Sequence, residues 1–362
     1  MPKSNTKYVI DPLSVKTSCS SEESYIRCVE YGKSKAHYSS LILLAKAILA
    51  GVFVGVCAHA SGIAGSAISP VHVRSFVQSR KCGLFYYHKL REYVGASMSA
   101  FVYGFTFPIA FLCIICTGSD LFTGNTLAVT SALLHGKVSC LEYVRVMCIS
   151  LFGNYVGAVS FAFFVSYGSG AFHKKDEVDK NHIFQFLNDI AVKKVNHNFI
   201  ECICLAIGCN IFVCLAVYFV LSIKDGSGMV FSVFFAVYAF AIAGYEHIIA
   251  NIYTLNISLM IDTEVSFTQV YFNNLLPTLI GNYVSYVILR VKNGQHHVTS
   301  IKLPVRLFWP HINRNEERWR CCMRAAVGHT YILPPAARLT ELLLTTREDF
   351  YVTTFRSAKK FF

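Results

Sequence analysis

The chain has 362 residues, of which 54% are hydrophobic and 15% charged, and its formal net charge is +12. A mean hydropathy of +0.45 lies well above that of soluble domains, which excludes an ordinary soluble enzyme or binding module. The positive charge comes without a recognition motif for nucleic acid, so no such partner is expected. The composition therefore predicts an all-α, multi-pass membrane protein in contact with lipid.

Six apolar segments follow a polar N-terminal segment, residues 1-40, which is predicted to lie in the cytosol. The predicted spans are 41-63, 97-134, 138-172, 199-222, 229-262 and 267-290. About twenty apolar residues cross the hydrocarbon, so two of these segments are too long for one straight helix. Six crossings place both termini on the same side, and we expect them to be cytosolic.

Both long segments contain a polar interruption, near residues 118-125 and near residues 244-251. Non-helical backbone at membrane depth must be buried in protein or line a wet cavity. Gly124 and Gly244 are expected to allow tight turns there. Two such interruptions predict a central permeation site formed by two broken helices.

The two halves of the chain also echo each other. Ser150-Leu151-Phe152-Gly153-Asn154-Tyr155-Val156 resembles Thr278-Leu279-Ile280-Gly281-Asn282-Tyr283-Val284, an offset of 281 − 153 = 128 residues. The same offset carries Leu121 to Ile249. With three spans per half, the sequence predicts inverted three-helix repeats within the domain 41-290.

Two further regions differ from the spans. The loop 64-96 is basic, and its function is not indicated by its residues. The segment 291-362 has twelve Lys/Arg and five Asp/Glu, 12 − 5 = +7, which is typical of a basic cytosolic tail beside anionic lipid. No metal cluster, cofactor motif or catalytic constellation is evident in the spans, so neither a cofactor nor enzymatic activity is expected.

Several ionisable or polar side chains stand in or beside the predicted spans. Lys46 and Lys194 are candidates for attracting an anion, or for snorkelling to the interface. His247, beside Glu246, is either a proton relay or a neutral side chain that holds the loop. Thr123, Asn125 and Asn251 offer hydrogen-bonding groups at the interruptions.

Aromatic residues predict apolar necks between the lysines and His247, with Phe107, Phe111, Phe122 and Phe240 as the candidates. Carrying an anion through such a neck costs on the order of tens of kcal/mol by an idealised Born estimate, and less after relaxation. Protonating a carboxylate of pKa about 4 at about pH 7 costs only about 4 kcal/mol. The arrangement therefore favours a weak monoacid that crosses together with a proton.

The runs Asp120-Leu121-Phe122-Thr123-Gly124-Asn125-Thr126 and Ala241-Ile242-Ala243-Gly244-Tyr245-Glu246-His247-Ile248-Ile249-Ala250-Asn251 resemble the formate-nitrite transporter family, most closely its lactate/proton symporters in apicomplexan parasites. The resemblance covers about residues 33 to 290. It implies an aquaporin-like bundle of six spans, assembled as a homopentamer in the plasma membrane. The implied substrates are L-lactate, formate, acetate and pyruvate.

The resemblance also implies roles for individual residues. His247 would be the central histidine, opposite the loop that carries Thr123, and Lys46 and Lys194 would be the vestibule lysines. The implied constriction consists of Phe107, Phe111 and Phe122 on one side of His247, and of Phe240 and Val213 on the other. Asn210 is the implied polar lining of the fourth span, and Gly124 is the implied inhibitor-sensitive position.

Three alternatives stay open. An anion channel for formate, nitrite or hydrosulfide would have the same fold and would conduct current. A water or neutral-solute pore is disfavoured because paired Asn-Pro-Ala loops are missing. A membrane-embedded enzyme lacks a nucleophile-base pair.

Overall fold

The computed structural model describes residues 17–67, 98–174 and 182–292, with side chains up to residue 285. Most of the basic loop 64-96 and nearly all of the tail 291-362 lie outside these residues. The described part is helical apart from one isolated β-bridge, Ser18 with Ile223. The fold is thus all-α.

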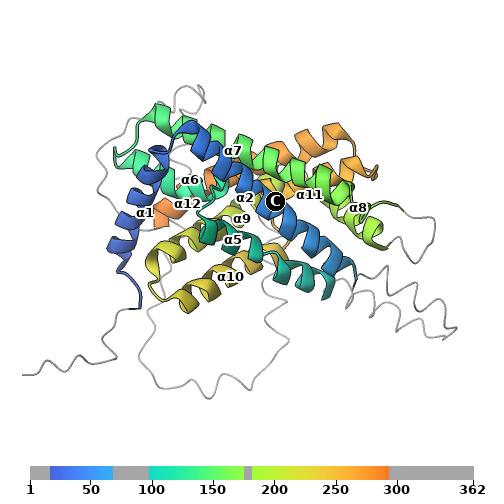
Figure 1. Ribbon diagram of the computed structural model, residues 1–362, viewed down its shortest axis with the longest axis horizontal. Coiled ribbons are helices and arrows are strands. Elements are labelled where there is room, and N and C mark those ends of the chain that lie inside the picture. The colour runs from blue at the N-terminus through green and yellow to red at the C-terminus, as the bar shows by residue number, and fades with distance from the viewer. Residues whose placement is uncertain (1–16, 68–97, 175–181, 293–362) are drawn as a thin grey trace, which may run out of the picture. The chain divides into compact units, whose positions relative to one another are not determined.

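The helices follow one another along the chain (Figure 1) as α1 (Ser21–Ala36), α2 (Ser40–Ser66), Met98–Thr117 with α5 (Ile109–Thr117) as its second part, α6 (Phe122–Leu134), α7 (Cys140–Phe161), η2 (Ala162–Tyr167), α8 (His182–Val195), α9 (Phe199–Ser222), α10 (Gly226–Ile242), α11 (Ile248–Met260), η4 (Gln269–Leu275) and α12 (Leu276–Lys292). Four helices of the described chain are long and apolar enough to cross a membrane: Ser40–Ser66, Met98–Thr117, Cys140–Tyr167 and Phe199–Ser222. Two shorter apolar helices are Gly226–Ile242 and Ile248–Met260.

Local sequence explains where several helices begin. Ser20 and Ser39 accept hydrogen bonds from backbone N–H groups in the first turns of α1 and α2, as N-cap residues do. Capping boxes start α7, with Ser139 and Glu142, and α9, with Asn198 and Glu201. These caps fix the helix starts, and the apolar residues that follow supply the buried faces.

Small residues allow two helix pairs to approach closely. α2 packs most extensively against α7, and α9 against α12. A Cβ atom added to Gly157 in α7 would lie 2.0 Å from the carbonyl oxygen of Ile48, and one added to Gly281 in α12 would lie 2.5 Å from that of Ile203. In a membrane this close packing replaces the hydrophobic effect as the source of helix association.

Both predicted interruptions are present, but they are shorter than expected. The first runs from Gly118 to Leu121 and the second from Ala243 to His247, because α6 and α11 start directly afterwards. Gly118 and Gly244 have positive φ values of 65° and 69°. Gly124 is not a turn residue, contrary to our expectation, because it lies inside α6.

Candidate functional site

The first interruption is built around a buried ionic cluster that we call the Lys35 cluster: Lys35, Asp120, Asn125 and Ser150. Nζ of Lys35 donates to Asp120 Oδ1 and to Asn125 Oδ1, each at 2.7 Å. Nδ2 of Asn125 donates to Asp120 Oδ2 and Ser150 Oγ, each at 2.8 Å, and Ser150 also donates to Asp120. The lysine and aspartate side chains are only 7% and 2% exposed, so the cluster is closed to bulk water.

The charge state of Lys35 follows from its partners. Burial alone would lower the pKa of the Lys35 ammonium, but its interactions with the Asp120 carboxylate and with Tyr31 together outweigh burial and raise this pKa above its usual value. Lys35 is placed by the end of α1, where Arg145 donates to the carbonyls of Ala36 and Tyr38. The cluster therefore holds a fixed cation and a fixed anion side by side.

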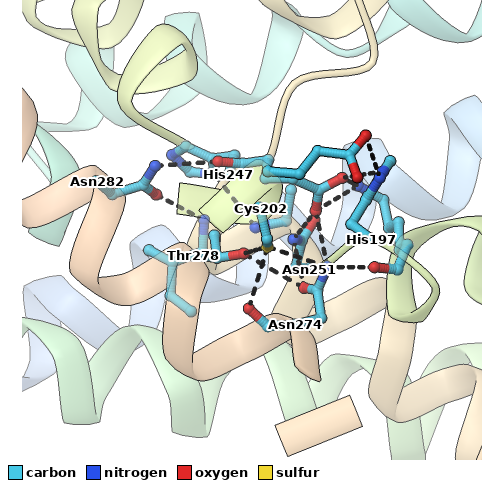
Figure 2. Close-up of polar contacts among 12 residues, drawn as sticks. His197, Cys202, His247, Asn251, Asn274, Thr278 and Asn282 are labelled. Atoms are coloured by element: carbon cyan, nitrogen blue, oxygen red, sulfur yellow. Dashed lines mark hydrogen bonds and ion pairs between the residues drawn. The ribbon is translucent and has the colours of Figure 1, made fainter. Parts of the chain in front are cut away.

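The second interruption carries a matching arrangement, the Lys194 cluster: Lys194, Glu246, Asn251 and Asn274. Nζ of Lys194 lies 3.0 and 3.1 Å from the two carboxylate oxygens of Glu246. Asn251 and Asn274 also donate to Glu246, and Asn274 donates to the backbone carbonyl of Lys194 at 2.9 Å. Figure 2 shows Asn251 and Asn274 meeting in this network.

Two asparagines hold the interruptions in place. Oδ1 of Asn154 accepts from the N–H of Phe122 at 2.8 Å, while its Nδ2 donates to the carbonyls of Ala47 and Asp120. Asn282 repeats the pattern: it accepts from the N–H of Ile248 at 2.8 Å and donates to the carbonyls of Ala206 and Glu246. Each asparagine thus replaces backbone hydrogen bonds that the broken helix cannot make itself.

At the interruptions, the sequence offset between equivalent residues of the two halves is two residues smaller than the predicted offset of 128. The equivalent pairs Asp120 and Glu246, and Asn125 and Asn251, are related by 246 − 120 = 126 and 251 − 125 = 126 residues. Asn154 and Asn282 keep the offset of 128. The predicted match of Leu121 with Ile249 is therefore wrong, because the chain from Asn251 to Asn282, 282 − 251 = 31, is two residues longer than the chain from Asn125 to Asn154, 154 − 125 = 29.

Between the two clusters, His247 meets Thr123. Nε2 of His247 lies 3.0 Å from Oγ1 of Thr123, and both side chains are buried. Nδ1 of His247 accepts from the N–H of Ala250 at 3.2 Å as the N-cap of α11. Since Nδ1 is an acceptor, the neutral ring carries its proton on Nε2 and donates it to Thr123.

This geometry favours the neutral ring among the two roles considered for His247, and the proton-relay role stays a prediction. A relay through the ring would need Nδ1 to take up a proton, which would break the cap of α11. A neutral donor at Nε2 is compatible with every contact that the ring makes. Thr123 accepts from His247 and keeps its own hydroxyl proton to donate elsewhere.

The predicted aromatic residues lie in the same region. The rings of Phe107 and Phe240 are in edge contact, with their centroids 6.2 Å apart. The ring of Phe240 stacks on that of His247, with a centroid distance of 5.7 Å. Phe111, Phe122 and Val213 are also buried. Phe111 lines a small pocket of about 40 Å³ together with Tyr31, Lys35, Leu121, Gly124 and Val217.

Lys46 and Asn210 make structural contacts in addition to the roles predicted for them, which stay predictions. Lys46 is half-buried, and its Nζ donates to the Gly118 carbonyl at 2.8 Å and lies 4.9 Å from the Tyr38 ring centre. Asn210 is fully buried and links α9 to Thr126 of α6 and to Asn282 and Ser285 of α12. Lys46 thus supports the first interruption, and Asn210 joins helices.

Lys35, the lysine that corresponds to Lys194 in the structure, is absent from the residues that the sequence predicted for the site. A regular offset could have revealed it, since 194 − 35 = 159 and the carbonyl partners of the two asparagines, Ala47 and Ala206, are also related by 206 − 47 = 159. The repeat therefore starts before the first apolar segment. Lys35 was overlooked because it stands in polar α1.

Apolar helices folded around buried ionic clusters define a multi-pass membrane protein of the transport class. A family model described as formate/nitrite transporter matches residues 22–291. The chain belongs to the formate/nitrite transporter family, as the resemblance of its two motifs predicted. Members of this family are transporters rather than enzymes.

Curated relatives support the same assignment. Formate-nitrite transporters of Plasmodium ovale and Plasmodium falciparum are 91% and 72% identical, over 79% and 80% of this chain and 86% and 88% of their own lengths. Formate-nitrite transporter 3 of Toxoplasma gondii is 38% identical over 73% of this chain and 48% of that protein.

Solved structures share the fold. An FNT family ion channel superposes with a TM-score of 0.60 at 23% identity, covering 74% of this chain and 96% of that one. A pentameric formate channel with formate bound gives a TM-score of 0.52 at 21% identity, covering 70% and 94%. At these identities the likeness establishes the fold alone.

Proposed function

We propose that the protein carries small monocarboxylates, L-lactate first and also formate, acetate and pyruvate, together with a proton across the plasma membrane. The observation that carries the proposal is the position of the His247–Thr123 pair between two buried lysine–carboxylate clusters. Both lysines already have a carboxylate partner. An incoming monocarboxylate would therefore meet, in each cluster, a lysine whose surroundings already bind a carboxylate.

The path between the clusters favours the neutral acid. Phe107 packs against Phe240, Phe240 stacks on His247, and the N–H of Ala250 at Nδ1 favours the neutral imidazole ring. A bare anion would lose its hydration there at a cost of several kcal/mol even after relaxation. Protonation of a carboxylate of pKa about 4 costs about 4 kcal/mol in water at about pH 7, against an idealised cost on the order of tens of kcal/mol for moving the bare anion into the apolar neck, so the acid is the cheaper species.

At the centre, Thr123 and His247 would handle the acid as a hydrogen-bonding unit. Nε2 of His247 orients the Thr123 hydroxyl, whose proton can then bond a carbonyl oxygen of the acid. The lysines attract the anion and yield it after protonation. We further propose a homopentamer with six spans and one pore in each protomer, cytosolic termini, and inhibitor sensitivity at Gly124; the pentameric formate channel of the same fold supports this assembly.

An anion channel for formate, nitrite or hydrosulfide is the second candidate. The names of the relatives and of the solved formate channel favour small anions. Such a channel would carry current, whereas an acid–proton carrier would not.

The test is uptake of radiolabelled L-lactate into proteoliposomes at about pH 5.5 and about pH 7.5, with and without an imposed pH gradient. Uptake above equilibrium that follows the proton gradient is expected, and His247→Ala should abolish most of it. Uptake that ignores the gradient would contradict the proposal and favour the channel.

A further inference from the structure

The Lys194 cluster has an additional titratable neighbour. His197 lies between α8 and α9, directly before Asn198, the N-cap of α9. Its Nε2 lies 3.8 Å from Glu246 Oε1, and its Nδ1 lies 3.3 Å from Glu201 Oε1. Figure 2 shows His197 at the edge of the network that contains Asn251 and Asn274.

Glu246 of this cluster and Glu201 contact His197, and the other charged and titratable groups named next interact with Glu246 or Lys194. Lys194 comes from α8, Glu201 and the Cys202 thiol from α9, and Glu246 from the second interruption. Tyr103, from the helix Met98–Thr117, interacts electrostatically with Lys194 and Glu246. Among them Glu201 is half-exposed and screened by water, whereas Glu246 is 1% exposed.

The Lys35 cluster has no counterpart of His197 among the described residues. The offset of 159 that relates Lys35 to Lys194 carries His197 to Tyr38 and Glu201 to Ile42. The ring of Tyr38 faces the ammonium of Lys46, and Ile42 is exposed. The two clusters thus differ in a histidine, a side chain type that in general changes charge near neutral pH. The helices α1 and α8 lie at opposite sides of Figure 1.

Protonation of His197 would place a second cation beside the buried Glu246 carboxylate. A neutral imidazole leaves Lys194 as the main cation that balances Glu246. An imidazolium at 3.8 Å shares this carboxylate, weakens its hold on the Lys194 ammonium and makes the local potential more positive. Both effects favour a carboxylate anion that approaches Lys194.

We propose that His197 is a pH-responsive positioning residue of the Lys194 cluster, which on protonation competes for Glu246 and frees Lys194 to draw the substrate anion. The proposal rests on monocarboxylate transport as the function. It predicts that acidification strengthens substrate capture at the α8 side beyond the change that protonation of the substrate itself produces.

The experiment compares wild type with His197→Gln and His197→Arg in right-side-out and inside-out vesicles, by lactate uptake at about pH 5.5 and about pH 7.5. Ratios of KM between protein variants at one pH cancel the titration of the substrate. His37→Gln, an exposed histidine after α1, is the matched control.

In one vesicle orientation only, His197→Gln should raise KM about threefold to tenfold at the lower pH and leave it unchanged at the higher pH. His197→Arg should show, at both pH values, the low KM that wild type shows at about pH 5.5. The kcat of both variants should change little, and the His37→Gln control should behave as wild type. A ratio of the His197→Gln KM to the wild-type KM that is the same at both pH values, or in both vesicle orientations, would overturn the role of His197. Wild-type vesicles without any lactate uptake would instead overturn the proposed function, and this proposal with it.

Discussion

Replacing Glu246 by Gln should destabilise the protein strongly, because it leaves a buried lysine without its anion. The carboxylate accepts from Lys194, Asn251 and Asn274, and the side chains of Lys194 and Glu246 are 16% and 1% exposed. Removing one partner of such a pair costs about 3–5 kcal/mol. Loss of the charge alone accounts for this cost, since Gln has nearly the shape of Glu.

A double variant separates stability from transport. Lys194→Gln with Glu246→Gln removes both charges, so most of the lost stability should return, whereas uptake at neutral pH should stay at least about tenfold below wild type because the Lys194 cluster no longer holds a lysine that attracts the anion. Thermal unfolding of the purified protein and lactate uptake measure the two effects. Glu23→Gln, which breaks an exposed pair with Arg27, is the control and should change neither. A double variant as unstable as the single one, or as active as wild type, would refute the reasoning.

Three further predictions concern the rest of the site. Lys35→Met with Asp120→Asn should lower the melting temperature by an amount that is constant from about pH 6 to about pH 9: the pKa of Lys35 is raised, so its stabilising charge is complete below the ordinary lysine value of about 10.4 and is lost only above it. Calorimetry measures the two melting temperatures. A difference in melting temperature between wild type and the double variant that becomes smaller between about pH 6 and about pH 9 would count against the Lys35–Asp120 ion pair. Thr123→Val should reduce uptake about tenfold by leaving Nε2 of His247 unpaired, at a cost of about 1–3 kcal/mol, while Thr123→Ser keeps the hydroxyl and the activity; equal uptake by both variants would argue against a hydroxyl role. Gly124→Val should impair lactate more than formate in competition assays, because its Cβ would lie 3.3 Å from Val217 Cγ2 beside the small pocket; an equal loss for both acids would contradict a size effect.

Much of the central geometry was visible in the sequence because it depends on local rules. Polar residues inside apolar segments placed both interruptions, and the family resemblance implied that His247 lies opposite the loop of Thr123. The motifs around them also identified the family correctly. Membrane burial makes such residues conspicuous, since lipid tolerates few polar groups without a partner.

Other parts depended on tertiary contacts that periodicity does not show. Lys35 stands in an amphipathic helix and enters the core only because α1 packs on α6 and Arg145 binds its end. Asn154 was noticed as part of a repeat, but its role needs Ala47 and Phe122 at hydrogen-bonding distance. The two-residue shift between the halves likewise follows from the length of chain around each interruption and not from sequence identity.

Simultaneous recording of lactate flux and electrical current in one membrane tests the central claim most directly. Reconstituted protein should carry radiolabelled lactate down a gradient at about pH 6 with no current attributable to the anion, and a co-trapped pH dye should report one proton for each lactate. A current that follows lactate flux and reverses at the lactate equilibrium potential would contradict acid–proton transport and establish an anion channel.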